Sequence, residues 1–222
     1  MADKFVYFDS ETDIVASEVA GHIRGLGYEP VMGDIERYHD GLVGAVLANP
    51  PVGAIRGGIE GTSDEMWAAA RDSFAAPMLE LTQTVGGILS RNGRGSIIYL
   101  NSIHAEKPLG DGFLYSMGCA AVQALCREAA LIYGSFGVGC YNIMRGIVEG
   151  EEGWFASDYS PVHHNSELRF PKGRVPPTDS LNELCAFLLG GGAYILNGSD
   201  LQADEGFAMY YGKSGYYSSE GN

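Results

Sequence analysis

Short apolar runs alternate along this chain with longer segments of helical periodicity. Strands are predicted at residues 5–8, 30–32, 44–48, 96–101 and 139–144, and a last strand begins at 194–196. Helices are predicted between them at residues 14–26, 64–90, 115–133 and 181–189. Such alternation is typical of βαβ units, which build a parallel sheet covered by helices on both faces. The predicted fold is therefore α/β, a doubly wound parallel sheet in three layers.

The length of 222 residues suits one domain with a full hydrophobic core. We expect a single domain over residues 1–207, followed by a Gly/Ser/Tyr-rich tail over residues 208–222. Two tyrosine pairs in this tail, at 210–211 and 216–217, are placed to reach a neighbouring subunit or to remain disordered.

The net charge of −14 limits the partners of the protein. With 14 basic against 28 acidic residues, no basic surface is expected, so nucleic acid and anionic membranes are excluded as partners. We expect no secretory leader from the first residues, and the four cysteines lack disulfide or zinc-ligand spacing. A cytoplasmic protein without a metal site is predicted.

Residues 95–150 contain a spaced set of side chains that resembles an oxidoreductase active site. Tyr115 follows Ser102 by thirteen positions, and Cys119 follows Tyr115 by four. This pattern resembles the short-chain dehydrogenase/reductase family, which has a serine, a tyrosine and a lysine at these spacings. The resemblance extends over nearly the whole chain, through Arg174-Val175-Pro176-Pro177, Phe187-Leu188, Ala193-Tyr194-Ile195-Leu196-Asn197-Gly198 and Ala203-Asp204-Glu205-Gly206-Phe207. It implies a Rossmann-like fold with intact regions for subunit assembly.

The cofactor loop of that family is not preserved. Its TGxxxGxG motif falls on residues 9–16, which contain no glycine and include Asp9, Glu11 and Asp13. Each carboxylate near a diphosphate opposes its binding by roughly 1 kcal/mol or more. Asp13 or Thr12 is instead expected to cap the following helix. We predict that no dinucleotide cofactor is bound.

Further departures affect the same side of the fold. The stretch from Asp34 to Ala48 is much shorter than in the family, so a shortened cofactor-side edge is predicted, and of the NNAG turn only Asn49 remains. The family's helix asparagine falls on Phe74 or Ser73, and its PG turn reads Arg145-Gly146.

The resemblance implies proton transfer by Tyr115 and substrate binding by Ser102. A neutral thiol at Cys119 cannot lower the tyrosine pKa from its free value of about 10 as the family lysine does. Ser102 and Tyr115 are thus remnants or inherited packing residues, Cys119 is a buried apolar side chain, and Arg145 is the candidate for a positive charge near Tyr115. His104 is a further pocket neighbour, and residues 150–171, with Trp154, Phe155, Tyr159 and the pair His163-His164, are expected to cover the pocket or contact a subunit.

Two functions remain open. The first is a catalytically degenerate subunit that supports an active paralogue of the family in a hetero-oligomer such as a heterotetramer, or that associates with itself. It resembles the arrangement in 2-[hydroxy(phenyl)methyl]-succinyl-CoA dehydrogenase, where one subunit lacks the cofactor site, and suggests acyl-CoA or aromatic-compound metabolism. The second is a cofactor-independent lyase, similar to the halohydrin dehalogenases, that uses Ser102 and Tyr115.

Overall fold

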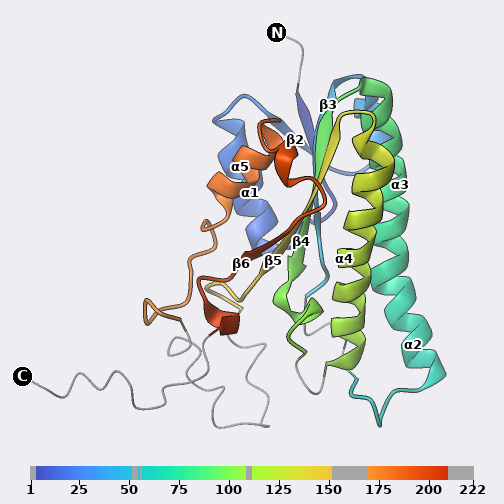
Figure 1. Cartoon of the computed structure of the whole chain (residues 1–222), viewed down its shortest axis with the longest axis vertical. Helices are drawn as coiled ribbons and strands as arrows, with labels where there is room; N and C mark the ends of the chain where they lie inside the picture. The colour runs from blue at the N-terminus through green and yellow to red at the C-terminus, as the bar shows by residue number, and fades with distance from the viewer. Residues whose placement is uncertain (1–3, 52–54, 56, 109–111, 152–169, 210–222) are drawn as a thin grey trace, which may run out of the picture.

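The fold is a single six-stranded parallel sheet between two layers of helices (Figure 1). The computed structural model describes residues 4–51, 55, 57–108, 112–151 and 170–209. The strand order is β2-β1-β3-β4-β5-β6. The strands are β1 (Phe5–Phe8), β2 (Glu29–Val31), β3 (Leu42–Ala48), β4 (Gly95–Ser102), β5 (Val138–Arg145) and β6 (Asp200–Ala203). The predicted doubly wound architecture is confirmed.

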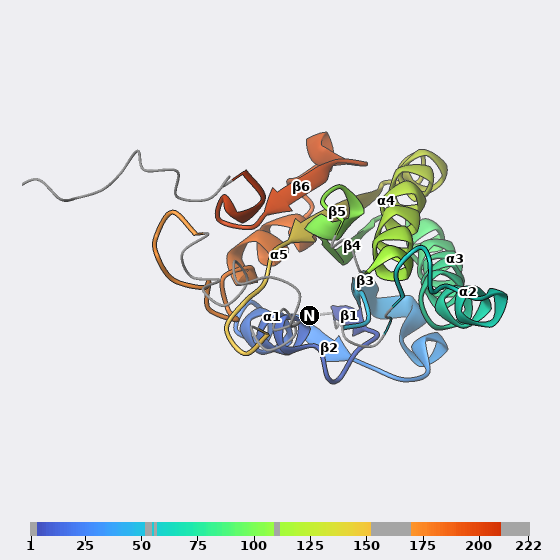
Figure 2. The same ribbon diagram turned by 90° about the horizontal axis from the view of Figure 1, so that it is seen from below.

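Helices cover both faces of the sheet, as the end view in Figure 2 shows. On one face lie α1 (Ile14–Arg24) and α5 (Asn182–Leu189); on the other lie α2 (Asp64–Ala70), α3 (Ala76–Asn92) and α4 (Phe113–Gly134). A π-helical turn, Arg71–Ala75, joins α2 to α3, so the predicted helix over residues 64–90 is one continuous element with a local distortion.

The central strands are buried on both faces, which explains their nearly continuous apolar sequences. In β4, every residue from Ser96 to Ser102 is buried, and β5 is buried from Val138 to Met144. Alternate side chains of these strands enter two separate hydrophobic clusters, one under α1 and α5 and one under α3 and α4. The sheet is therefore the common wall of two cores.

The last strand lies later in the chain than the sequence indicates. Tyr194–Leu196 form a 3-10 helix in which Ile195 is 91% exposed, and the strand is β6, paired with β5. Asn197 lies between this 3-10 helix and β6. Its side-chain oxygen accepts a hydrogen bond of 2.8 Å from the backbone N–H of Cys140 in β5. The prediction of a strand beginning at residues 194–196 is wrong, because a short apolar run does not by itself distinguish a strand from a helical turn.

The edge of the sheet beyond β1 is short, as predicted. Strand β2 has three residues, and a 3-10 segment, Ile35–Gly41, connects it directly to β3. No strand lies beyond β2 among the described residues. The sheet therefore extends only one short strand, β2, beyond β1.

Parallel strands end at a common edge, and polar side chains gather there. Asp9 follows β1, Asn49 follows β3, Ser102 ends β4 and Arg145 ends β5. Strand β2 lies on one side of β1 in the sheet, and β3 and all later strands lie on the other side. Open α/β sheets bind ligands at the point where the strand order reverses in this way, here between β1 and β3.

In the described part of the chain, none of the helices combines the length and apolar character that crossing a membrane requires.

Candidate functional site

The fold brings the three predicted site residues to one small cavity. Ser102 and Arg145 face each other in register across β4 and β5, and Tyr115 lies in the first turn of α4. Asn49 and Glu151 also line this cavity, in which about 20 Å³ is open to the centre of a water molecule. A single water needs about 10–15 Å³ by this measure. The cavity as it stands holds little more than one water molecule.

Tyr115 lies in the sequence between Ser102 and Cys119, the two other residues at the spacing described above. The side chains of Ser102 and Cys119 both lie close enough to its hydroxyl to influence its pKa. Burial raises the pKa of Tyr115 well above its ordinary value, and the charge of Arg145 opposes this only in part. Burial also raises the pKa of Cys119 to about 12. At neutral pH both groups are protonated, so neither is a general base or a nucleophile.

A buried pair of asparagines links β3, β4 and α4 beside this tyrosine. The amide of Asn49 donates to the side-chain oxygen of Asn101 at 2.5 Å and to the sulfur of Cys119 at 3.5 Å. Asn101 donates in turn to the backbone oxygen of Cys119 at 3.0 Å and accepts from the backbone N–H of Ser102 at 2.8 Å. Cys119 is thus held in a polar network that the sequence did not reveal, although its predicted burial is confirmed.

An aromatic side chain closes the other side of Tyr115. The ring of Phe74 lies 5.7 Å from the Tyr115 ring, centroid to centroid, and is fully buried. Ser73 instead donates a hydrogen bond to the backbone oxygen of Ala69 on the exposed face. Phe74 is therefore the residue that faces the site. It packs so closely on α4 that a Cβ at Gly118 would overlap its ring.

His104 is buried next to the same tyrosine. Its ring lies edge-on to the Tyr115 ring at 6.0 Å, and its Nδ1 is 2.7 Å from the backbone oxygen of Lys107. Its backbone N–H donates to the Ser102 hydroxyl at 3.3 Å. The predicted proximity of His104 to the pocket is confirmed, and the bond to Lys107 holds the ring in place.

Arg145 reaches the site but shares its charge with two carboxylates. It donates to both oxygens of Glu151, at 2.7 and 2.9 Å, and to Asp13 at 3.3 Å. Burial opposes the charge on Arg145, but Glu151 and Asp13 more than offset this, and its pKa lies above its usual value. This cluster of Asp13, Arg145 and Glu151, called the acidic-arginine cluster below, has a formal charge of −1. Arg145 is near Tyr115 but does not present it with an isolated positive charge.

The same cluster occupies the amino-terminal end of α1, where this fold class receives a phosphate. Asp13 is the N-cap and accepts a hydrogen bond of 2.8 Å from the backbone N–H of Ala16, so the predicted cap is confirmed. Asp9 accepts from the backbone N–H of Ala48 at 2.8 Å, and burial raises its pKa to about 6. A dinucleotide diphosphate does not fit these residues, because it would meet Asp13, Glu151 and an ionised Asp9 at the helix end.

Two further predictions concern the covering segment over residues 150–171 and the absence of a metal site. Trp154, Phe155, Tyr159, His163 and His164 lie outside the described residues, as do the tail tyrosines from 210 onward. Among the described residues, no group of three His, Cys, Asp or Glu side chains is suited to hold a metal ion.

Glu151 is the site residue that sequence reasoning missed. It is one of three glutamates at positions 149, 151 and 152, and no spacing rule distinguishes the buried one from its neighbours. The available signal was Arg145 itself, because an arginine ending a buried strand requires a carboxylate partner.

Comparisons with known proteins agree with the fold. The model of the enoyl-(acyl carrier protein) reductase family matches residues 29–208. No curated protein matches the sequence. A solved dehalogenation enzyme is 16% identical, with a TM-score of 0.78 over 93% of this chain and 100% of that one. A variant of actinorhodin polyketide ketoreductase with NADPH is 17% identical, with a TM-score of 0.79 over 94% and 98% of the two chains. A gluconate 5-dehydrogenase from Burkholderia cenocepacia with NADP and tartrate is 15% identical, with a TM-score of 0.78 over 94% and 96%.

Proposed function

The chain belongs to the short-chain dehydrogenase/reductase family, and from this membership we propose that it is a degenerate member that supports an active dehydrogenase paralogue in a hetero-oligomer. It binds neither NAD nor NADP and performs no hydride transfer. The proposed arrangement is that of a non-catalytic subunit, as in 2-[hydroxy(phenyl)methyl]-succinyl-CoA dehydrogenase, with acyl-CoA or aromatic compounds as the substrate class.

The acidic-arginine cluster is the observation that carries the proposal. Removing Arg145 from Glu151 and Asp13 to admit a diphosphate would leave two carboxylates at the helix end without their cation. Breaking a buried pair in this way costs about 3–5 kcal/mol. The protonated Tyr115 and Cys119 support the same conclusion, since neither exchanges protons near neutral pH.

An apolar groove between α3 and α4 supports the assembly part of the proposal. The groove has a volume of about 470 Å³ and is lined by small and aliphatic side chains that include Ala75, Leu79, Ala121, Leu125 and Ile132. Leu79 is 46% exposed and Ile132 is 57% exposed. An exposed apolar patch of this kind marks a protein interface. A paralogous subunit with the same pair of helices is the occupant that the proposal requires.

Purification of the tagged chain from its native host tests this assembly. A dehydrogenase paralogue is expected to co-purify with the unmodified chain and to be lost with Ile132→Asp, which places a charge in the groove. Leu26→Asp is the matched control, because Leu26 is similarly exposed but lies beyond α1 on the opposite face of the sheet. Recovery of a homo-oligomer without a paralogue would sink the proposal.

Calorimetric titration with NAD and NADP tests the cofactor part separately. No heat of binding is expected for the isolated chain. Micromolar affinity for either nucleotide would contradict the argument from the helix end, whatever the subunit composition.

A cofactor-independent lyase is the second candidate, and two observations favour it. Arg145 and Tyr115 line one cavity with Ser102, and a dehalogenation enzyme shares the fold over its whole length. On this alternative, the purified chain releases halide from a vicinal halohydrin, and Tyr115→Phe abolishes the release. Retention of full activity by Tyr115→Phe would show that Tyr115 takes no part in the reaction.

A further inference from the structure

The apolar groove between α3 and α4 has one charged side chain among its described lining residues, that of Glu128. Most of the others are alanine, leucine, valine or isoleucine, and the polar ones are Thr82, Gln83 and Tyr133. The hydroxyl of Thr82 is already engaged, at 2.9 Å, with the hydroxyl of Tyr99 in the core. Apolar neighbours give a carboxylate no hydrogen bonds once water is excluded, so its charge must be satisfied in some other way.

Glu128 lies within the apolar stretch of α4 and not at its end. Ala124 and Ile132 also line the groove and are four residues away on either side, so the three side chains lie on one face of the helix. All three residues are exposed. Water therefore solvates the carboxylate in the isolated chain, and a protein that covers the groove must also cover Glu128.

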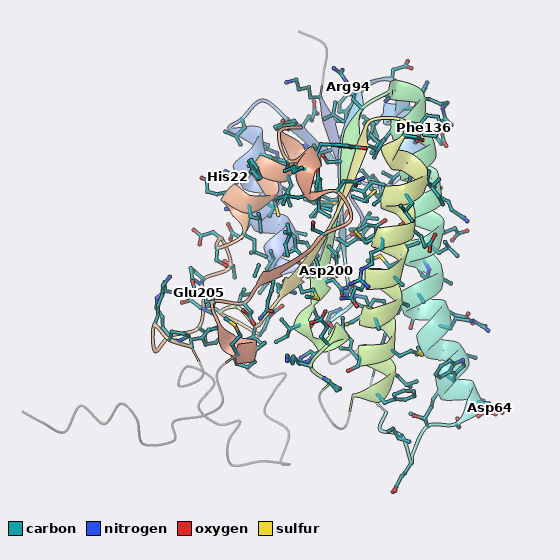
Figure 3. All side chains as sticks on the ribbon, viewed as in Figure 1. His22, Asp64, Arg94, Phe136, Asp200 and Glu205 are labelled. Carbon is teal, nitrogen blue, oxygen red and sulfur yellow. The ribbon has the colours of Figure 1, made fainter. Side chains whose placement is uncertain are left out.

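No cation in the described part of the chain neutralises Glu128. None of the ion pairs among the described residues includes it, and none of the described lining residues is basic. The neighbouring Arg127 pairs with Asp200 instead. Asp200 begins β6 and lies on the side of α4 opposite to α3, as Figure 3 shows. The groove therefore carries a negative charge into any interface that it forms.

This charge opposes pairing of the groove with a second copy of the chain. A two-fold dimer uses the same patch on both subunits, so each copy would bring its own Glu128 to the interface. The described lining of the groove offers neither carboxylate a basic partner. Covering both carboxylates without a cation costs free energy, as does placing like charges together across an interface. The apolar surface favours association, whereas the charge discriminates against self-association.

We propose that Glu128 determines which subunit occupies the groove: it pairs with a lysine or arginine of a paralogous subunit and disfavours a second copy of this chain. This inference rests on the proposed function and adds the residue that makes the assembly hetero-oligomeric. Charge-assisted hydrogen bonds between a carboxylate and a basic side chain offset the loss of hydration when the groove is covered. The partner is thus defined by apolar side chains that fill the groove and by one cation that faces Glu128.

Sedimentation velocity of the isolated full chain tests the discrimination against self-association. Glu128→Gln removes the charge but keeps the size of the side chain, and is expected to lower the Kd of self-association by about tenfold or more. Glu18→Gln is the matched control and should leave this Kd unchanged, because Glu18 is an exposed glutamate of α1 on the opposite face of the sheet. An unchanged Kd for Glu128→Gln, or an equal decrease in both variants, would overturn the proposal.

A double variant locates the gained contact. Combining Glu128→Gln with Ile132→Asp restores a charge to the same face of α4, one turn away, and should remove the gain in self-association. If the double variant self-associates as strongly as Glu128→Gln alone, the contact lies outside the groove and the assignment of Glu128 is wrong.

Co-purification from the native host tests the cation of the partner. Glu128→Lys is expected to reduce recovery of the paralogue by about tenfold or more, because it sets two cations against each other, whereas Glu18→Lys should retain the paralogue. Thermal unfolding checks that both variants are folded. Equal recovery with Glu128→Lys would refute this inference and leave the proposed function standing. Recovery of the unmodified chain without a paralogue would contradict the proposed function itself.

Discussion

At the carboxyl ends of the strands, Arg145 is buried between Glu151 and Asp13 beside a cavity of about 20 Å³, whereas at the amino ends Lys4 and Arg94 border a cavity of about 260 Å³. The two ends share one sheet but differ in how their cations are neutralised. At the first end, the chain supplies its own carboxylates; at the second, no described residue does so. Where carboxylates of the chain already neutralise the cation, little attraction remains for an anionic ligand. This holds even at the end of the sheet where the fold class ordinarily binds one.

The largest effect on stability is expected from removing Arg145, the cation at the carboxyl ends of the strands. Arg145→Ala leaves the buried Glu151 and the partly buried Asp13 without their partner, and should lower the free energy of unfolding by about 3 kcal/mol. Urea unfolding measures this loss. Arg91→Ala, at an exposed position, should change it by less than about 0.5 kcal/mol. Equal midpoints for the two variants would show that the acidic-arginine cluster does not hold the fold together.

A smaller loss is expected from overfilling the wall behind Tyr115. Gly118→Ala forces a Cβ into the ring of Phe74 and should cost about 1–3 kcal/mol. At Gly87 on α3, a Cβ meets only the end of the Arg91 side chain, at 3.7 Å. Gly87→Ala should therefore add about 0.5–1 kcal/mol, since alanine favours a helix. If Gly118→Ala is also stabilising, the packing around Tyr115 is looser than the structure indicates.

The charge on Asp9 should produce a change that depends on pH. Its folded pKa of about 6 lies above the ordinary value of 3.8, so its neutral form stabilises the fold below pH 3.8, and this contribution is lost as the pH rises through about 6. Asp9→Asn keeps the acceptor for Ala48 without the charge. It should raise the free energy of unfolding at about pH 7 by about 1 kcal/mol and leave it unchanged near pH 4. An equal gain at both pH values would contradict the assigned cause.

The smallest effect on stability is expected at the open end. Arg94→Gln should change the free energy of unfolding by less than about 0.5 kcal/mol, because Arg94 has no ion-pair partner among the described residues. Thermal unfolding in the absence of ligand measures it. A loss of stability comparable to that of Arg145→Ala would mean that Arg94, like Arg145, makes contacts that stabilise the fold. The contrast between the two ends of the sheet would then disappear.

Much of this fold could be predicted from local sequence. The strands near Phe5, Gly44 and Ser96 are continuous apolar runs, and burial on both faces of a parallel sheet requires such runs. The last strand was misplaced because Tyr194–Leu196 are apolar yet belong to a 3-10 turn. Local composition identifies elements well when their burial is uniform, and poorly at an exposed edge.

The site was predictable in position but not in its electrostatics. Ser102 and Tyr115 are brought together by a spacing that the sequence displays. Arg145 and Asp13, by contrast, are 132 residues apart, and Glu151 is one of several nearby acids. Which carboxylates pair with a buried arginine depends on the closure of the whole sheet, and no local pattern contains that information.

The capping of α1 by Asp13 affects how the stability of the protein depends on ligand concentration. A helix end completed by a dissociable ligand gains stability in proportion to the logarithm of ligand concentration. Here the capping group, Asp13, is covalently part of the chain and is paired with Arg145, so its occupancy of that end is constant. If the proposed function holds, the thermal stability of this chain should therefore be insensitive to the size and redox state of the nicotinamide pool.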